Sequence, residues 1–384
     1  MRTLVSWPVG GVGGVQRYDA LLSKALLDLG HEVHLLLPRA IRVRDVEVYH
    51  GVSLRGTKII PYGILNCAGP YCDLVNSIYG YIRLISFLEK YDIIFLDSIP
   101  PSFITKKLNK NKNYFYYIHG AVTTRKPRPI LTKKINRFLL INIPNIIVDY
   151  EILFNRERVF ANSMFTAMLS RHALGYVPEV LYPPVDIEKA AAHGHDKELA
   201  VSMFARFNAA KGWEFALNTF NDVVKKCDLD KTQLYLLGAV NSSFEARYVK
   251  HLISLSEKLG IRNKIKVIVN PSLDKAYEIL GKSMAFMHVR PNEPFGIVVV
   301  EAMAVGSVPV VHRSGGPWFD IVNMGKYGYG FAGKEEAVES LCKILTSDRE
   351  FSRMSRLART RAMQFSYQIF KDKIKNIISR LTNF

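Results

Sequence analysis

The hydrophobic and polar positions alternate between the period of a strand and the period of a helix from the first residues onward. A short apolar run from Thr3 to Trp7 predicts a strand, and apolar residues then recur at helical spacing from Val15 to Leu29. Gly30 ends this helix, and the apolar run from Glu32 to Leu37 predicts a second strand directly after it. The opening of the chain therefore predicts a βαβ unit, from which parallel sheets are built.

The same alternation continues through the chain and predicts an α/β protein with two doubly wound, Rossmann-like domains. A stretch rich in small and polar residues at 186–197 predicts a boundary between domain 1–188 and domain 189–365. The C-terminal segment 366–384 has one apolar helical face and is expected to pack back on the first domain. A cleft between the domains is the natural ligand site. Further strands are expected at 93–96, 114–118, 158–161, 199–204, 233–237, 266–269, 285–288 and 308–311.

The segment from Glu293 to Glu301 has a carboxylate at each end, with seven residues between them. Residues 297–300 are β-branched and would alone favour a strand, but the Ala-Met-Ala sequence and Gly306 that follow predict a helix ending at a glycine. The start of this helix would offer backbone N–H groups to a phosphate, and the two glutamates would accept hydrogen bonds from sugar hydroxyls. Those N–H groups belong to Phe295, Gly296 and Ile297.

Two other features are typical of phosphate binding, and each also has an ordinary structural explanation. The glycine-rich loop from Gly10 to Gly14 separates a strand from a helix, where it exposes backbone N–H groups or simply forms a tight turn. Arg206 and Lys211 follow the first predicted strand of the second domain, where they would neutralise a diphosphate or remain solvated at the surface.

The composition excludes several classes of protein. The chain has 384 residues, of which 48% are hydrophobic and 22% charged, so a disordered or fibrous chain is excluded and two globular domains are expected. The most apolar stretch, 138–154, is interrupted by polar residues, so no membrane span is expected. The first residues lack the apolar segment of a secretory signal, which predicts a cytoplasmic protein. The cysteines do not have zinc-site spacing and are expected to be thiols, with a Cys67–Cys72 disulfide left open.

The net charge of +18 predicts an anionic partner, which could be nucleic acid, a phospholipid surface or a phosphorylated substrate. Residues 98–148 contain ten basic residues and no acidic one, with aromatic residues interleaved. This basic segment contains no recognisable nucleic-acid-binding module, and a nucleic-acid-binding protein would leave the motifs of the second domain unexplained. Nucleic acid is therefore the least favoured of the three partners.

In combination, these motifs resemble the retaining, nucleotide-sugar-dependent glycosyltransferases of the family 4 type, and the resemblance extends over nearly the whole chain. It implies the GT-B architecture, in which two Rossmann-like domains face each other across a cleft. The segment 314–322 is similar to the mannosyltransferases that extend lipid-linked oligosaccharides from GDP-mannose. The motifs that carry the resemblance are the glycine-rich loop, Tyr116 to Gly120, Arg206 with Lys211, the two glutamates, and Ser314-Gly315-Gly316-Pro317.

The resemblance implies a role for each of these positions. The donor phosphates would lie against Gly13 and Gly14, and Arg206 and Lys211 would bind the diphosphate. Glu301 would hold the ribose, Glu293 would contact the donor sugar, and His119 would lie near its reactive face. The residues expected in catalysis are His119, Glu293, Arg206 and Lys211.

We therefore expect a hexosyltransferase that moves a hexose, most simply mannose from GDP-mannose, to a hydroxyl of a saccharide with retention of configuration. Fixed cations would stabilise the leaving diphosphate, so no metal or other cofactor is expected. A UDP-sugar transferase of the same fold is the closest alternative. The acceptor is expected to be polyprenyl-linked, with the basic segment contacting an anionic membrane at the cytoplasmic face through Lys106, Lys107, Lys133 and Lys134.

Overall fold

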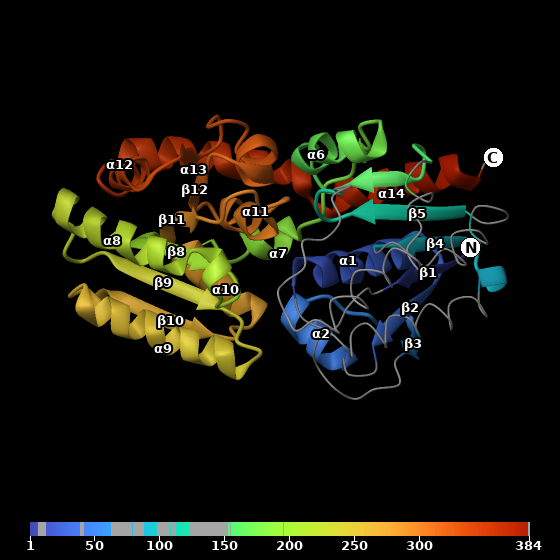
Figure 1. The fold of residues 1–384 in the computed structure, drawn as a ribbon, viewed down its shortest axis with the longest axis horizontal. Helices are drawn as coiled ribbons and strands as arrows, with labels where there is room; N and C mark the ends of the chain where they lie inside the picture. The colour runs from blue at the N-terminus through green and yellow to red at the C-terminus, as the bar shows by residue number, and fades with distance from the viewer. Residues whose placement is uncertain are drawn as a thin grey trace, which may run out of the picture. The chain divides into compact units, whose positions relative to one another are not determined.

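The computed structural model of the chain describes residues 1–6, 13–38, 42–62, 79, 88–97, 108, 113–122, 153, 155–194 and 196–382. Residue contacts divide it into two compact units, residues 1–182 with 370–384 and residues 183–369 (Figure 1). The sequence placed a boundary after residue 188, within a helix, α7 (Ile187–Ala191), that follows the observed division.

The first unit contains a parallel sheet of seven strands in the order β3-β2-β1-β4-β5-β6-β7. Its strands are β1 (Arg2–Ser6), β2 (Glu32–Pro38), β3 (Lys58–Tyr62), β4 (Ile93–Leu96), β5 (Asn113–Ile118), β6 (Val159–Ala161) and β7 (Glu179–Val180). Its described helices are α1 (Gly14–Asp28), α2 (Val43–His50), α6 (Met164–Leu174), the short 3-10 helix η1 (Leu88–Lys90) and most of α14 (Tyr367–Thr382).

The second unit repeats the arrangement with six parallel strands in the order β10-β9-β8-β11-β12-β13. These are β8 (Glu198–Phe204), β9 (Gln233–Gly238), β10 (Ile265–Val269), β11 (Ser283–His288), β12 (Val308–His312) and β13 (Tyr329–Phe331). Its longer helices, besides α7, are α8 (Trp213–Cys227), α9 (Ser243–Lys258), α10 (Leu273–Lys282), α11 (Ile297–Ala304), α12 (Lys334–Leu345) and α13 (Asp348–Ala362). Its single-turn segments are η3 (Ala209–Lys211), η4 (Arg262–Lys264), η5 (Pro317–Ile321) and η6 (Met363–Phe365).

The strands expected from the sequence are all present, within one or two residues at their ends. The three strands that the sequence did not predict, β3, β7 and β13, all lie at the edge of a sheet. Pro61 lies inside β3, where an edge position tolerates the missing N–H group. The predicted α/β class and the two parallel Rossmann-like sheets are therefore confirmed.

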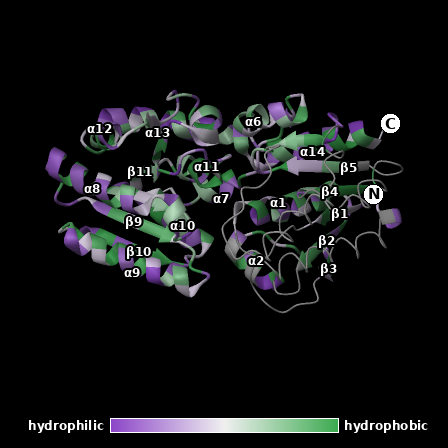
Figure 2. Cartoon of the chain, viewed as in Figure 1, coloured by the Kyte–Doolittle hydropathy of each residue, from purple (hydrophilic) through white to green (hydrophobic). Residues whose placement is uncertain are grey.

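The helix expected after Glu293 is confirmed as α11, although it contains three consecutive valines. Six of its eight residues are buried, so tertiary packing outweighs the low helix propensity of valine. Figure 2 shows the pattern that produces such packing: β9 is hydrophobic along most of its length, whereas α8 and α9 alternate hydrophobic and hydrophilic positions. The fully buried ring of Trp213 on α8 belongs to the resulting core.

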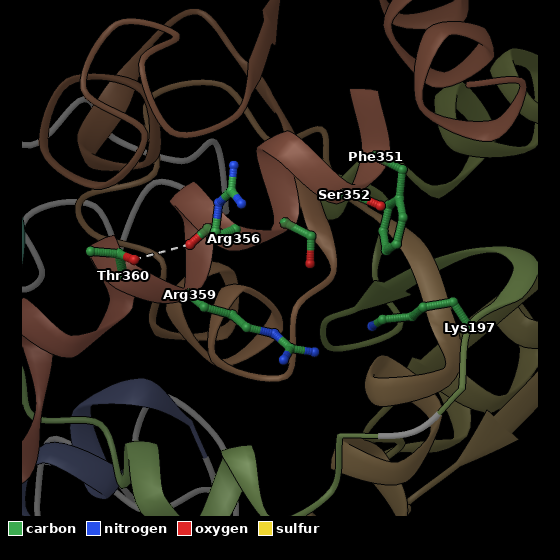
Figure 3. A pocket seen from close by; sticks show the side chains of 7 residues that line it. Lys197, Phe351, Ser352, Arg356, Arg359 and Thr360 are labelled. Carbon is green, nitrogen blue, oxygen red and sulfur yellow. Dashed lines mark hydrogen bonds between the residues drawn. The ribbon is translucent and has the colours of Figure 1, made fainter. Parts of the chain in front are cut away.

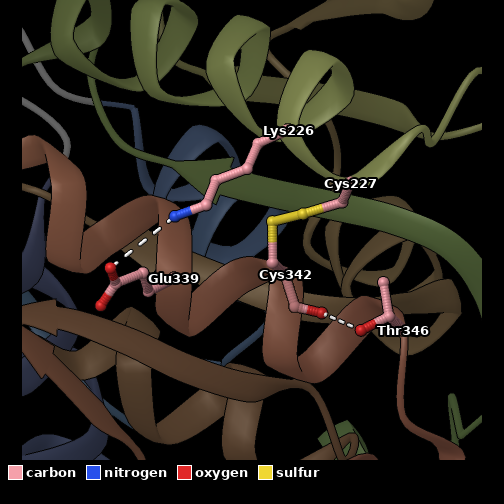
Figure 4. Close-up of a disulfide and its surroundings, with 5 residues drawn as sticks. All are labelled: Lys226, Cys227, Glu339, Cys342 and Thr346. Carbon is pink, nitrogen blue, oxygen red and sulfur yellow. Dashed lines mark hydrogen bonds and ion pairs between the residues drawn. A yellow bond between two sulfur atoms is a disulfide. The ribbon is translucent and has the colours of Figure 1, made fainter.

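The expectation of thiols at Cys227 and Cys342 is wrong, because the structure joins them in a disulfide between α8 and α12 (Figure 4). Their Cα atoms are 6.1 Å apart, a separation that a disulfide spans without backbone movement. An ion pair between Lys226 and Glu339 joins the same two helices beside it. The 115-residue separation of the two cysteines gave no local signal, since only the fold brings these helices together.

Several expectations concern residues outside the described part of the chain. These are Cys67, Cys72 and the basic side chains Lys106, Lys107, Lys133 and Lys134, together with Gly10 in the glycine-rich loop. In the described part, none of the helices combines the length and apolar character needed to span a bilayer.

We expect the Cys227–Cys342 disulfide to stabilise the second unit by about 2–4 kcal/mol, because it closes a long loop in the unfolded chain. The double variant Cys227→Ser, Cys342→Ser should therefore unfold at lower urea concentration than wild type. Both proteins should carry serine at positions 67 and 72, so that a reductant acts on one pair only. A reductant should lower the urea midpoint only of the protein that retains Cys227 and Cys342. Equal urea midpoints of the two proteins without reductant would contradict a stabilising disulfide.

Candidate functional site

The candidate site in the second unit lies where the order of its strands reverses. β8 lies between β9 and β11. The chain continues from β8 to β9 on one side and from β11 to β12 on the other, so it leaves the neighbouring strands β8 and β11 in opposite directions. The loops after the carboxyl ends of two such strands diverge and leave a crevice, which is where open α/β sheets bind ligands. Arg206 and Lys211 follow β8, and Glu293 follows β11. The fold therefore brings together three residues that the sequence analysis selected separately.

Glu293 is the centre of a cluster of charged side chains. One carboxylate oxygen, Oε2, lies 3.0 Å from Nζ of Lys211 and 2.9 Å from Nη1 of Arg290. Nε2 of His288 lies 3.9 Å from the same oxygen. Sequence reasoning missed Arg290 and His288, although both stand at the carboxyl end of a predicted strand, where ligand-binding residues gather.

Burial controls the protonation of this cluster. It lowers the pKa of His288 to about 4, so this imidazole is neutral at neutral pH. Burial also lowers the pKa of Lys211, an effect that Glu293 opposes and the positive charges of Arg290 and Arg206 reinforce. For Glu293, burial alone would raise the pKa, but the positive side chains around it lower the pKa overall. The cluster therefore contains an ionised carboxylate between two cations whose attraction for an anion is only partly screened by bulk water.

Arg206 is exposed, and its side chain lies close enough to Lys211 to lower the pKa of that lysine. The backbone carbonyl of Arg206 accepts a hydrogen bond of 3.0 Å from Nε1 of the buried Trp213. The loop after β8 is thus anchored to the core, while its arginine side chain remains available to solvent.

The loop 314–316 presses directly against the backbone of Glu293, Pro294 and Phe295. The N–H of Gly316 donates to the carbonyl of Glu293 at 2.8 Å, and the hydroxyl of Ser314 accepts from the N–H of Asn292 at 2.8 Å. A Cβ on Gly316 would lie 2.8 Å from Cα of Phe295, closer than real Cβ contacts come. The segment that begins at Glu293 and the loop 314–316 therefore form one structural unit. Their close contact requires a glycine at position 316.

The other residues expected at the donor site lie on α11 and just before it. Gly296 is the N-cap of α11, and Ile297 is its first residue, whereas the side chain of Phe295 is buried. Glu301 faces the interior: it has no exposed surface, and Oε1 accepts a hydrogen bond of 2.8 Å from the hydroxyl of Tyr277 on α10. Its contact with a ribose stays a prediction.

The sheet of the first unit also reverses its strand order, between β1 and β4. Gly13 caps the helix that follows β1, and Gly14 is the first residue of that helix, α1. His119 follows β5, and its Nε2 lies 3.5 Å from Oδ1 of Asp97, which follows β4. The ring of His119 packs edge-on against Tyr18 and Tyr117.

Asp97 and the buried Asp19 of α1 are functional candidates that the sequence analysis missed. Burial, followed by the charge of Asp97, raises the pKa of Asp19 well above its ordinary value. A raised pKa favours the protonated form of Asp19, beside the Asp97 carboxyl group that faces His119. The sequence did contain a signal for Asp97, which is an acidic residue directly after the predicted strand 93–96. It contained no signal for Asp19, because helical periodicity does not reveal a buried carboxyl pair.

Family models match both halves of the chain. A model described as Glycosyltransferase Family 4 matches residues 12–189, and one described as Glycosyl transferases group 1 matches residues 186–361. Together they extend over most of the described residues of both units.

Individual relatives and solved structures agree with this finding. The GDP-Man:Man(3)GlcNAc(2)-PP-Dol alpha-1,2-mannosyltransferase of Dictyostelium discoideum is 28% identical over 290 residues, which are 71% of this chain and 56% of that protein. The chain spans about half the length of the first such relatives. A glycosyltransferase from Rickettsia africae ESF-5 superposes with a TM-score of 0.73 at 17% identity, covering 99% of this chain and 98% of the other. Anabaena HepE, solved with UDP and glucose, gives 0.69 at 18% identity, covering 99% and 100%.

Replacing Gly316 should disrupt the site by steric overlap alone. Its φ of −56° is open to any residue, so Gly316→Ala tests the contact with Phe295 and not backbone strain. We expect a loss of about 1–3 kcal/mol in the free energy of unfolding of the second unit. Gly333→Ala is the matched control, because its Cβ would meet only a flexible carboxylate at an ordinary 3.5 Å. Equal thermal unfolding of the two variants would exclude the close contact as a constraint.

Proposed function

We propose that this chain, which belongs to glycosyltransferase family 4 and carries a group 1 glycosyltransferase domain, transfers mannose from GDP-mannose to a hydroxyl of a saccharide acceptor. The two parallel-sheet units have the GT-B fold. The observation that supports the activity best is the cluster of Lys211, Arg290 and Glu293 beside the N-terminus of α11, at the switch point of the second sheet. Such a cluster matches a donor with a negatively charged diphosphate next to a sugar.

The cations act on the leaving group. As the bond between the anomeric carbon and the phosphate oxygen breaks, negative charge develops on the diphosphate. Lys211 and Arg206 stabilise this charge together with the N–H groups at the start of α11, and they do so without reorganisation of solvent. Fixed cations then replace a divalent metal, so the proposed reaction needs no metal or other cofactor.

The acceptor hydroxyl attacks from the face that the diphosphate leaves. The departing phosphate oxygen takes the proton of that hydroxyl, so the configuration at the anomeric carbon is retained and no enzymatic nucleophile is needed. Glu293 positions the donor sugar, and Glu301 holds the ribose after releasing Tyr277. His119 lies near the reactive face, with its ring oriented by Asp97, and Gly13 and Gly14 approach the phosphates.

Mannose and guanine are proposed from the names of the relatives and from the resemblance of 314–322. UDP-glucose is the alternative, because Anabaena HepE, with the same fold, is described in complex with UDP and glucose. Both donors present the same diphosphate to Lys211 and Arg206, so the charged cluster serves either. The base and the sugar are therefore decided by direct comparison of the two donors.

We further propose a lipid-linked acceptor, as the name of the Dictyostelium relative suggests. The basic segment of the first unit would then attach the enzyme peripherally to the cytoplasmic face of an anionic membrane. Each basic residue near such a surface contributes about 1 kcal/mol of binding free energy.

Lys211→Ala should lower turnover of GDP-mannose by about 30- to 1000-fold, which corresponds to about 2–4 kcal/mol of lost transition-state stabilisation. Turnover is measured as release of GDP, with UDP-glucose in parallel and with excess EDTA in a further set. Lys225→Ala, at an exposed lysine of α8, is the control and should behave as wild type. A folded Lys211→Ala variant with wild-type turnover would exclude the role of this lysine, and loss of activity in EDTA that metal restores would exclude the metal-free mechanism.

The membrane proposal predicts salt-sensitive binding to anionic vesicles. Wild type should co-sediment with phosphatidylserine vesicles at low salt and be released as ionic strength rises. A variant with glutamine at Lys106, Lys107, Lys133 and Lys134 should bind much less, while a variant with four glutamines at Lys225, Lys226, Lys250 and Lys258 of the second unit retains binding. Identical binding by both variants would discard the basic segment as the membrane contact.

A further inference from the structure

A second group of cations surrounds a cavity beside α13, in the unit that carries the donor site. The cavity has a volume of about 400 Å³. The residues described along its wall include three cations, Lys197, Arg356 and Arg359, and no carboxylate. Ser352 adds a hydroxyl group, and the ring of Phe351 adds an apolar surface. None of these residues belongs to the motifs of the proposed donor site.

Two of the cations are held in place by backbone carbonyl groups. Nζ of Lys197 donates to the carbonyls of Ser283 and Val305, each at 3.1 Å, and Nη2 of Arg359 donates to that of Val305 at 3.3 Å. A Cβ on Gly306 would lie 2.6 Å from Cζ of Arg359, so a glycine is required for this guanidinium to lie here. Figure 3 shows the side chains of Lys197 and Arg359 pointing toward one another across the cavity.

The described residues supply no carboxylate that balances the positive charge of this cavity. Within the described ranges, no carboxylate forms an ion pair with Lys197, Arg356 or Arg359. Burial and, after it, the positive charge of Arg359 lower the pKa of Lys197 to about 7. Lys197 is partly buried and the two arginines are exposed, so an anion that enters the cavity from solvent is attracted by all three side chains.

We propose that this cavity binds a phosphate monoester dianion between Lys197, Arg356 and Arg359. Guanidinium groups bind phosphate oxygens through paired N–H donors, and an ammonium group supplies a point charge beside them. The cavity is larger than a phosphate group, and Phe351 offers a surface for the organic part of the ester. The ester is carried either by a soluble metabolite or by a lipid headgroup.

The position of this site connects it to α11. Val305 and Gly306, which contact Lys197, Arg359 and the hydroxyl of Ser355, directly follow α11. The donor-site motif precedes the same helix, which is about 12 Å long. The phosphate site is therefore separate from the donor site and lies at the opposite end of one buried helix. It is additional to the proposed transferase activity and does not depend on it.

Binding of inorganic phosphate, as the soluble probe, is measured by calorimetry on the full chain at constant ionic strength. Arg356→Gln is the test variant, since no hydrogen bond from this side chain within the described chain is lost. Arg349→Gln, which removes an exposed arginine of the same helix, is the matched control. Lys211→Ala removes phosphate binding at the donor site. Vesicles of phosphatidylcholine with and without phosphatidic acid form the second arm.

We expect Arg356→Gln to weaken phosphate binding at least five-fold, while Arg349→Gln and Lys211→Ala retain it. A loss confined to vesicles with phosphatidic acid would support the same site with a lipid as the source of the ester. Equal binding by wild type and Arg356→Gln in both arms would overturn the proposal. So would a loss in Lys211→Ala alone, because phosphate would then occupy only the donor site. GDP release by Arg356→Gln without phosphate should equal that of wild type. This measurement distinguishes failure of the phosphate-site proposal from failure of the transferase proposal.

Discussion

The close contact between two backbone segments determines the geometry of the second unit's site. Gly315 and Gly316 lie so near Glu293 and Phe295 that neither can carry a side chain. This contact, with its hydrogen bond from Gly316 to Glu293, fixes where the chain enters α11. The carboxylate of Glu293 consequently has a defined position, 3.0 Å from Lys211 on a different strand's loop. A side chain at either glycine would displace this backbone and with it the carboxylate that Lys211 and Arg290 contact.

Once the backbone is fixed, electrostatics determines what the site can bind. Two cations, Lys211 and Arg290, share one carboxylate, and His288 is neutral, so the cluster keeps a surplus of positive charge. Burial makes this surplus costly, as the lowered pKa of Lys211 indicates. A diphosphate would relieve the cost by supplying the missing negative charge. The cavity beside α13 is a related case, because the described residues along its wall include three basic side chains and no carboxylate.

The sequence predicted the central strands and the charged residues of the second unit, because hydrophobic runs and motif spacing are local properties. It missed β3, β7 and β13, since edge strands are short or, as with Pro61, contain residues that argue against a strand. It missed the Cys227–Cys342 disulfide and the pairing of Asp19 with Asp97, because both depend on contacts between distant segments. The pattern of residues along the chain identifies individual helices and strands, whereas contacts between distant segments are known only from the fold.

One topology used twice explains the division of chemistry in this chain. Each sheet reverses its strand order beside its first strand, so each unit gathers residues at one crevice. In the second unit these residues include the cations Lys211 and Arg290, which suit a leaving diphosphate. In the first unit they are His119, Asp97 and Asp19, so the carboxyl groups there lie near an imidazole rather than near a phosphate-binding cation. The same topology therefore gathers cationic side chains at the switch point of one sheet and an imidazole with two carboxyl groups at the switch point of the other.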